Sequence, residues 1–225
     1  VRPVKLLRRL AEESSEEQAV KKFEKDFFVS NEKIALSRET EHNERKILEL
    51  SKPESFSLYV GIPFCPSRCS YCSFVMASIE RAEKLIEPYT KLLCEEIKRT
   101  AEIANKLGLR LETVYFGGGT PTTLSAEQLD TVLGTVNNSF DMSTCREFTV
   151  EAGRPDTIDI AKLFALKENK VDRISINPQT VNDEVLKTIG RKHTAQQFFD
   201  AFELARKCGF DNINTDLIAG LPTDT

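Results

Sequence analysis

"YVGIPFCPSRCSYCSF", residues 59–74, places three of the six cysteines of this 225-residue chain within eight positions, at the spacing C-x3-C-x2-C. The β-rich stretch "SFSLYVGI" (55–62) leads directly into this segment. Three neighbouring thiols are an unusual number, because disulfides use cysteines in pairs and tetrahedral metal sites need a fourth ligand. The segment therefore raises a question of chemistry as well as of fold.

Strand and helix patterns alternate along the rest of the chain. Four further strands are predicted at 112–116, 146–151, 172–177 and 211–218, with helices between them. Pro88 fits the first turn of a helix that ends before Gly108, and Ser125 with Gln128 forms a capping box. Five β-α repeats in order predict an α/β fold with a parallel sheet and right-handed crossovers, closed as a (β/α) barrel or half-barrel.

Polar and glycine-rich segments follow the predicted strands. The first strand ends at the cysteine loop, and the later ones lead to the residues "GGGTP" (117–121), Glu151, Asn177 with Gln179, and Asp216. Chemistry in barrels of this kind collects at the carboxyl ends of the strands. The sequence therefore predicts an active site on that rim.

The chain is predicted to have a helical preface at 1–50, a linker at 51–55 ("SKPES") and a barrel core at 56–225. Within the preface, Ser14 or Ser15 and then Asn31 mark helix starts. A DNA-reading helix-turn-helix is the alternative for this segment. Its charges are mixed in sign and form no basic stripe, which favours the preface.

Bulk properties predict a cytoplasmic protein that binds neither nucleic acid nor membrane. The net charge is −4, and no apolar run approaches the roughly 20 residues of a membrane span. A reducing compartment favours metal or redox use of clustered cysteines over disulfides. The scattered Cys94, Cys145 and Cys208 lie in apolar-patterned segments and are predicted to be small buried hydrophobes.

Three interpretations of the cysteine loop compete. A zinc site would need a fourth ligand, and His193 lies more than a hundred residues away. A redox dithiol would use "CSYC" (69–72) and leave Cys65 without a role. A [4Fe–4S] cluster held by three thiolates keeps one iron open for a compact chelating ligand. The neighbouring glycines and carboxylate suit an adenosyl amino acid as that ligand, so we favour the cluster.

The motifs "GIPFCPSRCSYCSF", "GGGTP", "INPQTVNDEVLKTIGRKHT" and "DLIAGLP" resemble the radical S-adenosylmethionine (SAM) enzymes. The chain is most similar to the oxygen-independent coproporphyrinogen III oxidase group, and within it to the Firmicute-type coproporphyrinogen dehydrogenase branch. The resemblance covers 56–225, and "PVKLLRRLAEE" (3–13) extends it into the preface. Such barrels have six β-α units, so five predicted strands imply a barrel that is truncated at its C-terminal end.

The resemblance also implies roles for individual residues. Cys65, Cys69 and Cys72 would hold the cluster, and Tyr59 would lie near substrate and cofactor as a catalytic residue. The implied SAM contacts come from five segments of the rim, with Glu151 on the ribose and Arg191 on a carboxylate: Tyr71, Gly118, Gly119, Thr120, Glu151, Gln179, Arg191 and Asp216.

The implied reaction is oxygen-independent. SAM is cleaved to a 5′-deoxyadenosyl radical, which takes a hydrogen from a propionate of coproporphyrinogen III and leads to protoporphyrinogen IX in haem biosynthesis. The implied partners are a tetrapyrrole and a low-potential electron donor such as flavodoxin or ferredoxin.

Two positions depart from the pattern of the oxidases proper. Phe74 replaces a fourth cysteine, and Gly61 replaces a histidine before "IPF". Phe74 is the pattern of a haem-chaperone branch, so a haem-binding delivery protein with a retained SAM site is the alternative. A barrel fragment without activity of its own is a third interpretation.

Overall fold

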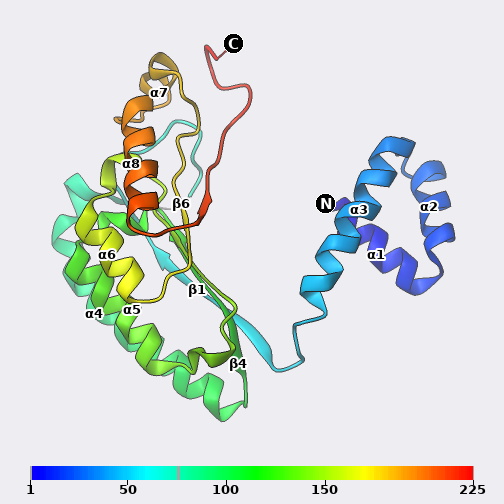
Figure 1. Ribbon diagram of the computed structural model, residues 1–225, viewed down its shortest axis with the longest axis horizontal. Helices are drawn as coiled ribbons and strands as arrows, with labels where there is room; N and C mark the ends of the chain where they lie inside the picture. Colours follow the sequence, from blue (N-terminus) through cyan, green and yellow to red (C-terminus); the bar gives the residue numbers. More distant parts are fainter. Residues whose placement is uncertain (1, 75–76, 225) are drawn as a thin grey trace. The chain divides into compact units, whose positions relative to one another are not determined.

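The computed structural model describes residues 2–74 and 77–224 (Figure 1). The chain divides into two compact units, Val1–Pro53 and Glu54–Thr225. This division falls inside the segment predicted as a linker, although Ser55 already belongs to the first strand.

The first unit contains three helices, α1 (Pro3–Glu13), α2 (Glu16–Lys25) and α3 (Asn31–Leu48). Ser15 caps α2, where its hydroxyl accepts a hydrogen bond from the backbone N–H of Gln18. The helices enclose a small apolar core made by one face of each, with Leu7, Leu10, Ala19, Phe23 and Ile34. A core of this size explains why the segment is so rich in charge, because most of its positions face water.

The second unit is built on one five-stranded sheet. Its strands are β1 (Ser55–Ile62), β4 (Arg110–Gly118), β5 (Glu147–Glu151), β6 (Arg173–Ser175) and β7 (Asn212–Asn214). They lie side by side in that order, and every pair is parallel. Parallel strands in sequential order form part of a (β/α) barrel, so the predicted fold class is confirmed.

Helices connect the strands and cover one side of the sheet, as Figure 1 shows for α4, α5, α6 and α8. The helices are α4 (Ile79–Lys106), α5 (Ala126–Ser139), α6 (Ile160–Glu168), α7 (Asp183–Thr188) and α8 (Ala195–Lys207). Side chains alternate along the strands. Ile62, Phe116 and Val150 are therefore buried among the helices, whereas Tyr59, Tyr115 and Glu151 point to the opposite, polar side.

Short elements shape the rim. Two-residue strands, β2 (Phe64–Cys65) and β3 (Ala77–Ser78), pair in parallel on either side of the cysteine loop. Single 3₁₀ turns follow β4 and β5 at the rim, η1 (Pro121–Thr123) and η3 (Pro155–Thr157), whereas η2 (Met142–Thr144) precedes β5 at the opposite end of the sheet. The short strands with η1 and η3 shape the loops that carry the candidate site.

Two sequence-based expectations about these elements are wrong. Pro88 does not start a helix, because α4 begins at Ile79 and continues through it. Pro88 is exposed, so the carbonyl that it leaves without a helical N–H faces water, while Ala82, Ile86 and Leu93 hold both halves against the core. The fifth strand is also shorter than 211–218, since β7 ends at Asn214 and only Leu217 returns to a bridge with Gln179.

The three scattered cysteines contribute to packing. Cys94 is buried on α4, and the half-buried Cys145 and Cys208 lie against the same core. No helix among the described residues has the length and apolar character needed to cross a membrane.

Candidate functional site

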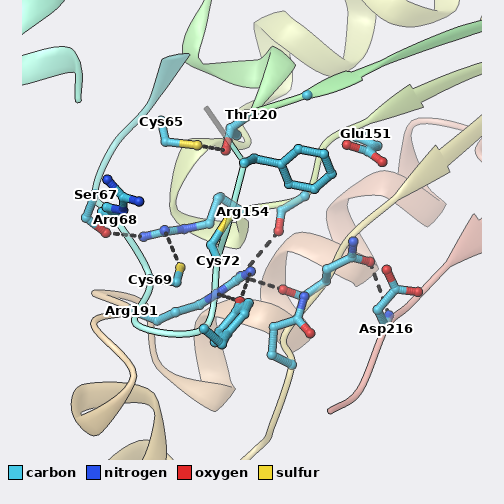
Figure 2. A pocket seen from close by; sticks show the side chains of 17 residues that line it. Cys65, Ser67, Arg68, Cys69, Cys72, Thr120, Glu151, Arg154, Arg191 and Asp216 are labelled. Atoms are coloured by element: carbon cyan, nitrogen blue, oxygen red, sulfur yellow. Dashed lines mark hydrogen bonds between the residues drawn. The ribbon is translucent and has the colours of Figure 1, made fainter. Parts of the chain in front are cut away.

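A cavity opens at the carboxyl ends of the strands (Figure 2). Eleven of the twelve predicted site residues line it, and Tyr59 is the exception. The cysteine loop contributes Cys65, Cys69, Tyr71 and Cys72; the β4 end contributes Gly118, Gly119 and Thr120; and Glu151, Gln179, Arg191 and Asp216 complete the set. The fold therefore brings together residues spread over more than 150 positions of the sequence.

The three thiols of the loop are free and share this cavity. Cys65 lies in β2, and its Sγ is 3.3 Å from the hydroxyl of Thr120. Cys69 is buried, and its carbonyl accepts the N–H of Cys72 at 3.1 Å in a tight turn. Burial raises the pKa of the Cys65 thiol, and the contact with Thr120 works against that increase.

The distances between the thiols bear on whether the loop binds a single zinc ion or an iron–sulfur cluster. Among residues 2–74 and 77–224, no three His, Cys, Asp or Glu side chains converge closely enough to hold a single metal ion. A structural zinc ion requires that convergence with four ligands. An iron–sulfur cubane does not, because each thiolate binds a different iron atom. Three free thiols around one cavity therefore suit a cluster.

The glycine segment allows close approach of the chain to the cysteine loop. The N–H of Gly119 donates to the carbonyl of Ile62 at 2.8 Å, and the N–H of Thr120 donates to that of Phe64 at 2.8 Å. A Cβ on Gly119 would lie 2.5 Å from the Phe64 carbonyl oxygen and 3.0 Å from the Sγ of Cys65. Gly118 has a φ of +105°, which side chains rarely adopt. This wall of the cavity therefore requires glycine.

Glu151 lies beside two tyrosines, Tyr115 and Tyr59. The hydroxyl of Tyr115 donates to its carboxylate at 2.5 Å. Burial raises the pKa of Glu151, the hydrogen bond from Tyr115 lowers it, and the charge of Asp216 raises it further. The ring of Tyr59 stacks on that of Tyr115, with centroids 6.0 Å apart. Tyr59 thus adjoins the site through Tyr115, although it lies outside the cavity lining.

Arg191 is buried and its guanidinium is occupied by protein groups. Nε and Nη2 donate to the hydroxyl of Tyr71 at 3.2 and 3.0 Å, and Nη1 donates to the carbonyl of Asn177 at 2.6 Å. Burial is the main cause that raises the pKa of Tyr71, to about 12, so its hydroxyl is neutral at pH 7. The family resemblance implies a carboxylate partner for Arg191; in this structure the Tyr71 hydroxyl lies against that edge of the guanidinium.

The loops after β6 and β7 meet at Gln179 and Asp216. The N–H of Gln179 donates to the Asp216 carbonyl at 3.0 Å, and the N–H of Asp216 donates to the Asn177 side chain at 3.1 Å. Gln179 has a φ of +69°, a strained conformation for a residue with a side chain, and such strain is common in binding sites. Asn177 also lines the cavity, so it joins the site.

One buried residue of the lining was missed by the sequence interpretation. Arg154 is 3% exposed and donates from Nη1 to the Sγ of Cys69 at 3.6 Å and from Nη2 to the hydroxyl of Ser67 at 3.1 Å (Figure 2). Its place three residues after Glu151, on the predicted rim, was the available signal. Its contact with Cys69 depends on tertiary structure and is invisible in the sequence.

The second unit is a five-stranded parallel barrel segment, and its rim carries three free cysteines and a glycine wall. The chain belongs to the radical SAM superfamily, whose family model matches residues 59–225. Proteins of this family bind a [4Fe–4S] cluster and SAM, and the cavity residues of this chain suit both groups.

The chain is also similar to individual members of this superfamily. The chain is 41% identical over 99% of its length to the "Oxygen-independent coproporphyrinogen-III oxidase-like protein HemZ" of Bacillus subtilis, of which it covers 45%. It is 42% identical over 78% of its length to the "Heme chaperone HemW" of Lactococcus lactis, of which it covers 44%. The chain thus spans about half the length of these curated relatives.

A solved structure of the same superfamily is also similar. Coproporphyrinogen III oxidase (HemN) from Escherichia coli, a radical SAM enzyme, superposes with a TM-score of 0.68 and 28% identity. The match covers 81% of this chain and 42% of that one.

Proposed function

We propose that this chain binds a [4Fe–4S] cluster through Cys65, Cys69 and Cys72 and uses it to cleave SAM reductively. The observation that supports this most strongly is the common cavity of the three free thiols, the glycine wall and Glu151. When bound, a reduced cluster of this kind supplies the electron that splits SAM into methionine and a 5′-deoxyadenosyl radical.

The protein's part in this chemistry is binding, orientation and exclusion of water. Gly118, Gly119 and Thr120 form the wall against which the methionine end of SAM lies. Glu151 accepts hydrogen bonds from ribose hydroxyls, oriented by the hydroxyl of Tyr115 at 2.5 Å. Gln179 and Asp216 close the opposite side, where their backbones are bonded to each other at 3.0 Å.

Arg191 and the two tyrosines have more specific roles. The guanidinium of Arg191 binds the carboxylate of SAM, a group that suits its fork of donors. Tyr71 packs beside the bound SAM. We assign to Tyr59, whose ring stacks on that of Tyr115, a catalytic role near the substrate and cofactor.

We assign the substrate as a tetrapyrrole and the reaction as the oxygen-independent oxidative decarboxylation of coproporphyrinogen III. The similarity to the HemZ protein over 99% of this chain supports this choice, as does the similarity to HemN. The reaction requires a low-potential electron donor such as flavodoxin or ferredoxin. We propose the cytosol as the protein's compartment, because a reducing compartment keeps the three cluster thiols available.

A haem-binding chaperone is the second candidate function. Phe74 lines the cavity and is 63% exposed at the position where the oxidases proper have a fourth cysteine. The 42% identity to HemW also favours this alternative. In that case the SAM site is retained and haem is the ligand that the protein delivers.

Anaerobic reconstitution with iron and sulfide tests the first proposal. We expect about four irons per chain and a reduced-state electron paramagnetic resonance (EPR) spectrum that changes when SAM is added. A well-formed cluster with a spectrum insensitive to SAM would contradict the open-iron site. Titration with haem separates the two candidates, because stoichiometric haem binding without formation of a vinyl product contradicts the decarboxylase.

A further inference from the structure

Arg154 lies at a fixed place behind the cysteine loop. It follows β5, and its carbonyl accepts hydrogen bonds from both the N–H and the hydroxyl of Thr157, at 2.9 and 2.8 Å, in the turn η3. Its side chain is as buried as the apolar core, at 3% exposure. Burying a cation costs free energy unless the cation is paired. The partners of the Arg154 guanidinium therefore indicate its role.

The guanidinium of Arg154 has two kinds of partner: the carboxylate of Asp156 and polar groups of the cysteine loop. Nε and Nη2 donate to the two carboxylate oxygens of Asp156 at 3.2 and 3.4 Å, which neutralises the guanidinium. Its remaining contacts reach the cysteine loop, at the Sγ of Cys69 (3.6 Å) and the hydroxyl of Ser67 (3.1 Å). Four of the five N–H groups are thus directed to the protein.

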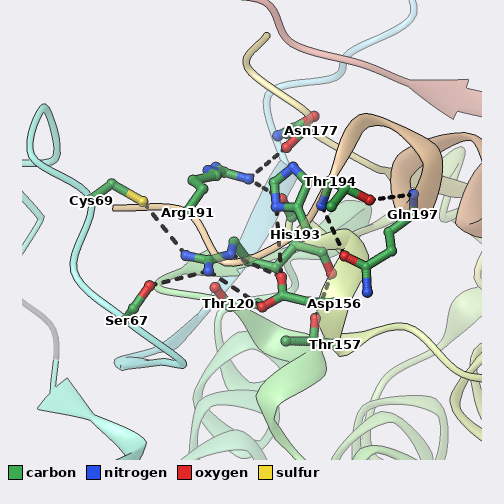
Figure 3. A network of polar contacts seen from close by, with 12 residues as sticks. Ser67, Cys69, Thr120, Asp156, Thr157, Asn177, Arg191, His193, Thr194 and Gln197 are labelled. Carbon is green, nitrogen blue, oxygen red and sulfur yellow. Dashed lines mark hydrogen bonds and ion pairs between the residues drawn. The ribbon is translucent and has the colours of Figure 1, made fainter. Parts of the chain in front are cut away.

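Further groups keep this arrangement in place. The hydroxyl of Ser67 donates to the carbonyl of Gly190 at 3.0 Å, which ties the loop to the turn before Arg191. His193 lies next to Asp156, with its Nδ1 3.8 Å from the carboxylate (Figure 3). The guanidinium therefore lies between the carboxylate of Asp156, whose side chain is 19% exposed, and one thiol of the loop.

Two of the three thiols, Cys65 and Cys69, consequently differ in their surroundings. Cys65 has a neutral hydroxyl at 3.3 Å, whereas Cys69 faces a charged donor. Hydrogen bonds to a cluster's sulfur atoms and nearby positive charge stabilise the more negative, reduced cluster, and so raise its reduction potential. Charge-assisted hydrogen bonds have the larger effect.

We propose that Arg154 is a positioning residue for Cys69, which orients this thiolate toward the cluster and makes the bound cluster easier to reduce. The inference rests on the proposed function, since it concerns the cluster that the three cysteines hold. It assigns Arg154 and Arg191 different tasks: Arg154 acts on the cluster through its ligand, and Arg191 acts on SAM.

The alternative is a structural ion pair between Arg154 and Asp156 with no effect on the cluster. The two explanations are separated by the reduction potential of the reconstituted cluster, measured by EPR in the absence of SAM. Two double variants remove the cation without leaving the Asp156 carboxylate unpaired beside the cysteine loop. Arg154→Gln/Asp156→Asn keeps polar side chains, and Arg154→Met/Asp156→Leu replaces the pair by apolar ones, a change that is often tolerated.

Arg68→Gln is the matched control. Arg68 is the neighbour of Cys69 in the sequence and lines the same cavity, but its side chain is exposed. The variant therefore removes one positive charge from the same loop at a place where water screens it.

We expect both double variants to shift the midpoint potential to more negative values and Arg68→Gln to keep the wild-type value. A folded double variant that binds less than half the wild-type iron, while Arg68→Gln loads fully, also supports positioning by Arg154. Full iron content with the wild-type potential in either double variant overturns the inference. Failure of the wild-type protein to form a SAM-sensitive cluster instead overturns the proposed function.

Discussion

The hydroxyl of Tyr71 lies across the Nε–Nη2 edge of the Arg191 guanidinium, at 3.2 and 3.0 Å. This edge is the one that binds the two oxygens of a carboxylate. The other side of the guanidinium is held by the carbonyls of Asn177 at 2.6 Å and Gly153 at 3.3 Å. A ligand carboxylate therefore has to displace the Tyr71 hydroxyl before it binds Arg191.

This relationship predicts that Tyr71→Phe increases the affinity for SAM. A net hydrogen bond is worth about 1 kcal/mol, so its loss from the ligand-free state corresponds to roughly fivefold tighter binding. Calorimetric titration of the reconstituted protein measures the change. Tyr59→Phe removes a hydroxyl that does not line the cavity and is expected to leave the affinity unchanged. Weaker binding by Tyr71→Phe would show that the hydroxyl contacts SAM directly.

The cysteines give a second prediction. Cys69→Ala removes one of three proposed ligands, and we expect the reconstituted protein to lose the cluster signal in its visible and EPR spectra. Cys94→Ala is the matched control, because Cys94 is equally buried but lies on α4 within the apolar core. That variant should keep its iron content and lose about 1 kcal/mol of folding stability at most. Loss of the cluster in both variants means that the ligands are misassigned.

The glycines give a third prediction, in which two identical substitutions have opposite outcomes. Gly119→Ala places a Cβ 2.5 Å from a backbone oxygen, and such overpacking costs ~1–3 kcal/mol. We expect a lower unfolding midpoint and poor cluster loading. Gly61→Ala meets only the Tyr59 ring at 3.6 Å, an ordinary contact, and should be neutral or stabilising by up to ~1 kcal/mol. Equal behaviour of the two variants in urea unfolding would contradict the close approach at Gly119.

The sequence brings most of the predicted rim residues together because they lie at or just after the ends of strands. Glu151 ends β5, and the glycines end β4, so the alternation of strand and helix is enough to place them together. Capping also depends on local chemistry, and the predicted Ser125–Gln128 box is confirmed.

The features missed by the sequence interpretation depend on tertiary contacts. A proline in the interior of a helix usually breaks or kinks it. The helix α4 continues through Pro88 because both of its halves pack on the core. Arg154 becomes part of the site through Cys69, which is 85 positions away. The hydrogen bond from Arg191 to the Tyr71 hydroxyl connects residues 120 positions apart. Local sequence patterns carry no information on such pairs.

Glu151 supports a fourth prediction, in which binding and stability change in opposite directions. Its pKa is raised by burial, so the folded protein holds this proton more tightly than the unfolded chain and stability falls as pH rises above the usual value of 4.5. Glu151→Gln removes this cost, and we expect equal or higher thermal stability at pH 7. Loss of charged acceptor oxygens should weaken SAM binding about tenfold or more.

Glu147→Gln is the control for that experiment. Glu147 lies four residues earlier on β5, is paired with Arg173 at 3.2 Å and does not line the cavity. The substitution should leave SAM affinity unchanged. Unchanged SAM affinity in Glu151→Gln would remove Glu151 from the binding site.

His193 gives the last prediction, which concerns acid stability. Burial lowers its pKa to about 4, the charges of Arg191 and Arg154 act in the same direction, and Asp156 opposes them. The folded state therefore favours neutral histidine, whereas the unfolded chain takes up a proton near pH 6.5. The stability contributed by this group is complete above pH 6.5 and is lost as pH falls toward 4. The expected loss between pH 7 and pH 5 is about 2 kcal/mol.

Urea unfolding of the cofactor-free protein at these two pH values measures the effect. His193→Gln should unfold with a smaller difference between pH 7 and pH 5 than the wild type, whatever its absolute stability. His42→Gln, which changes the other histidine of the chain at an exposed position on α3, should keep the wild-type difference. If His193→Gln retains the full difference, another group titrates in this range and His193 is not the source of the acid sensitivity.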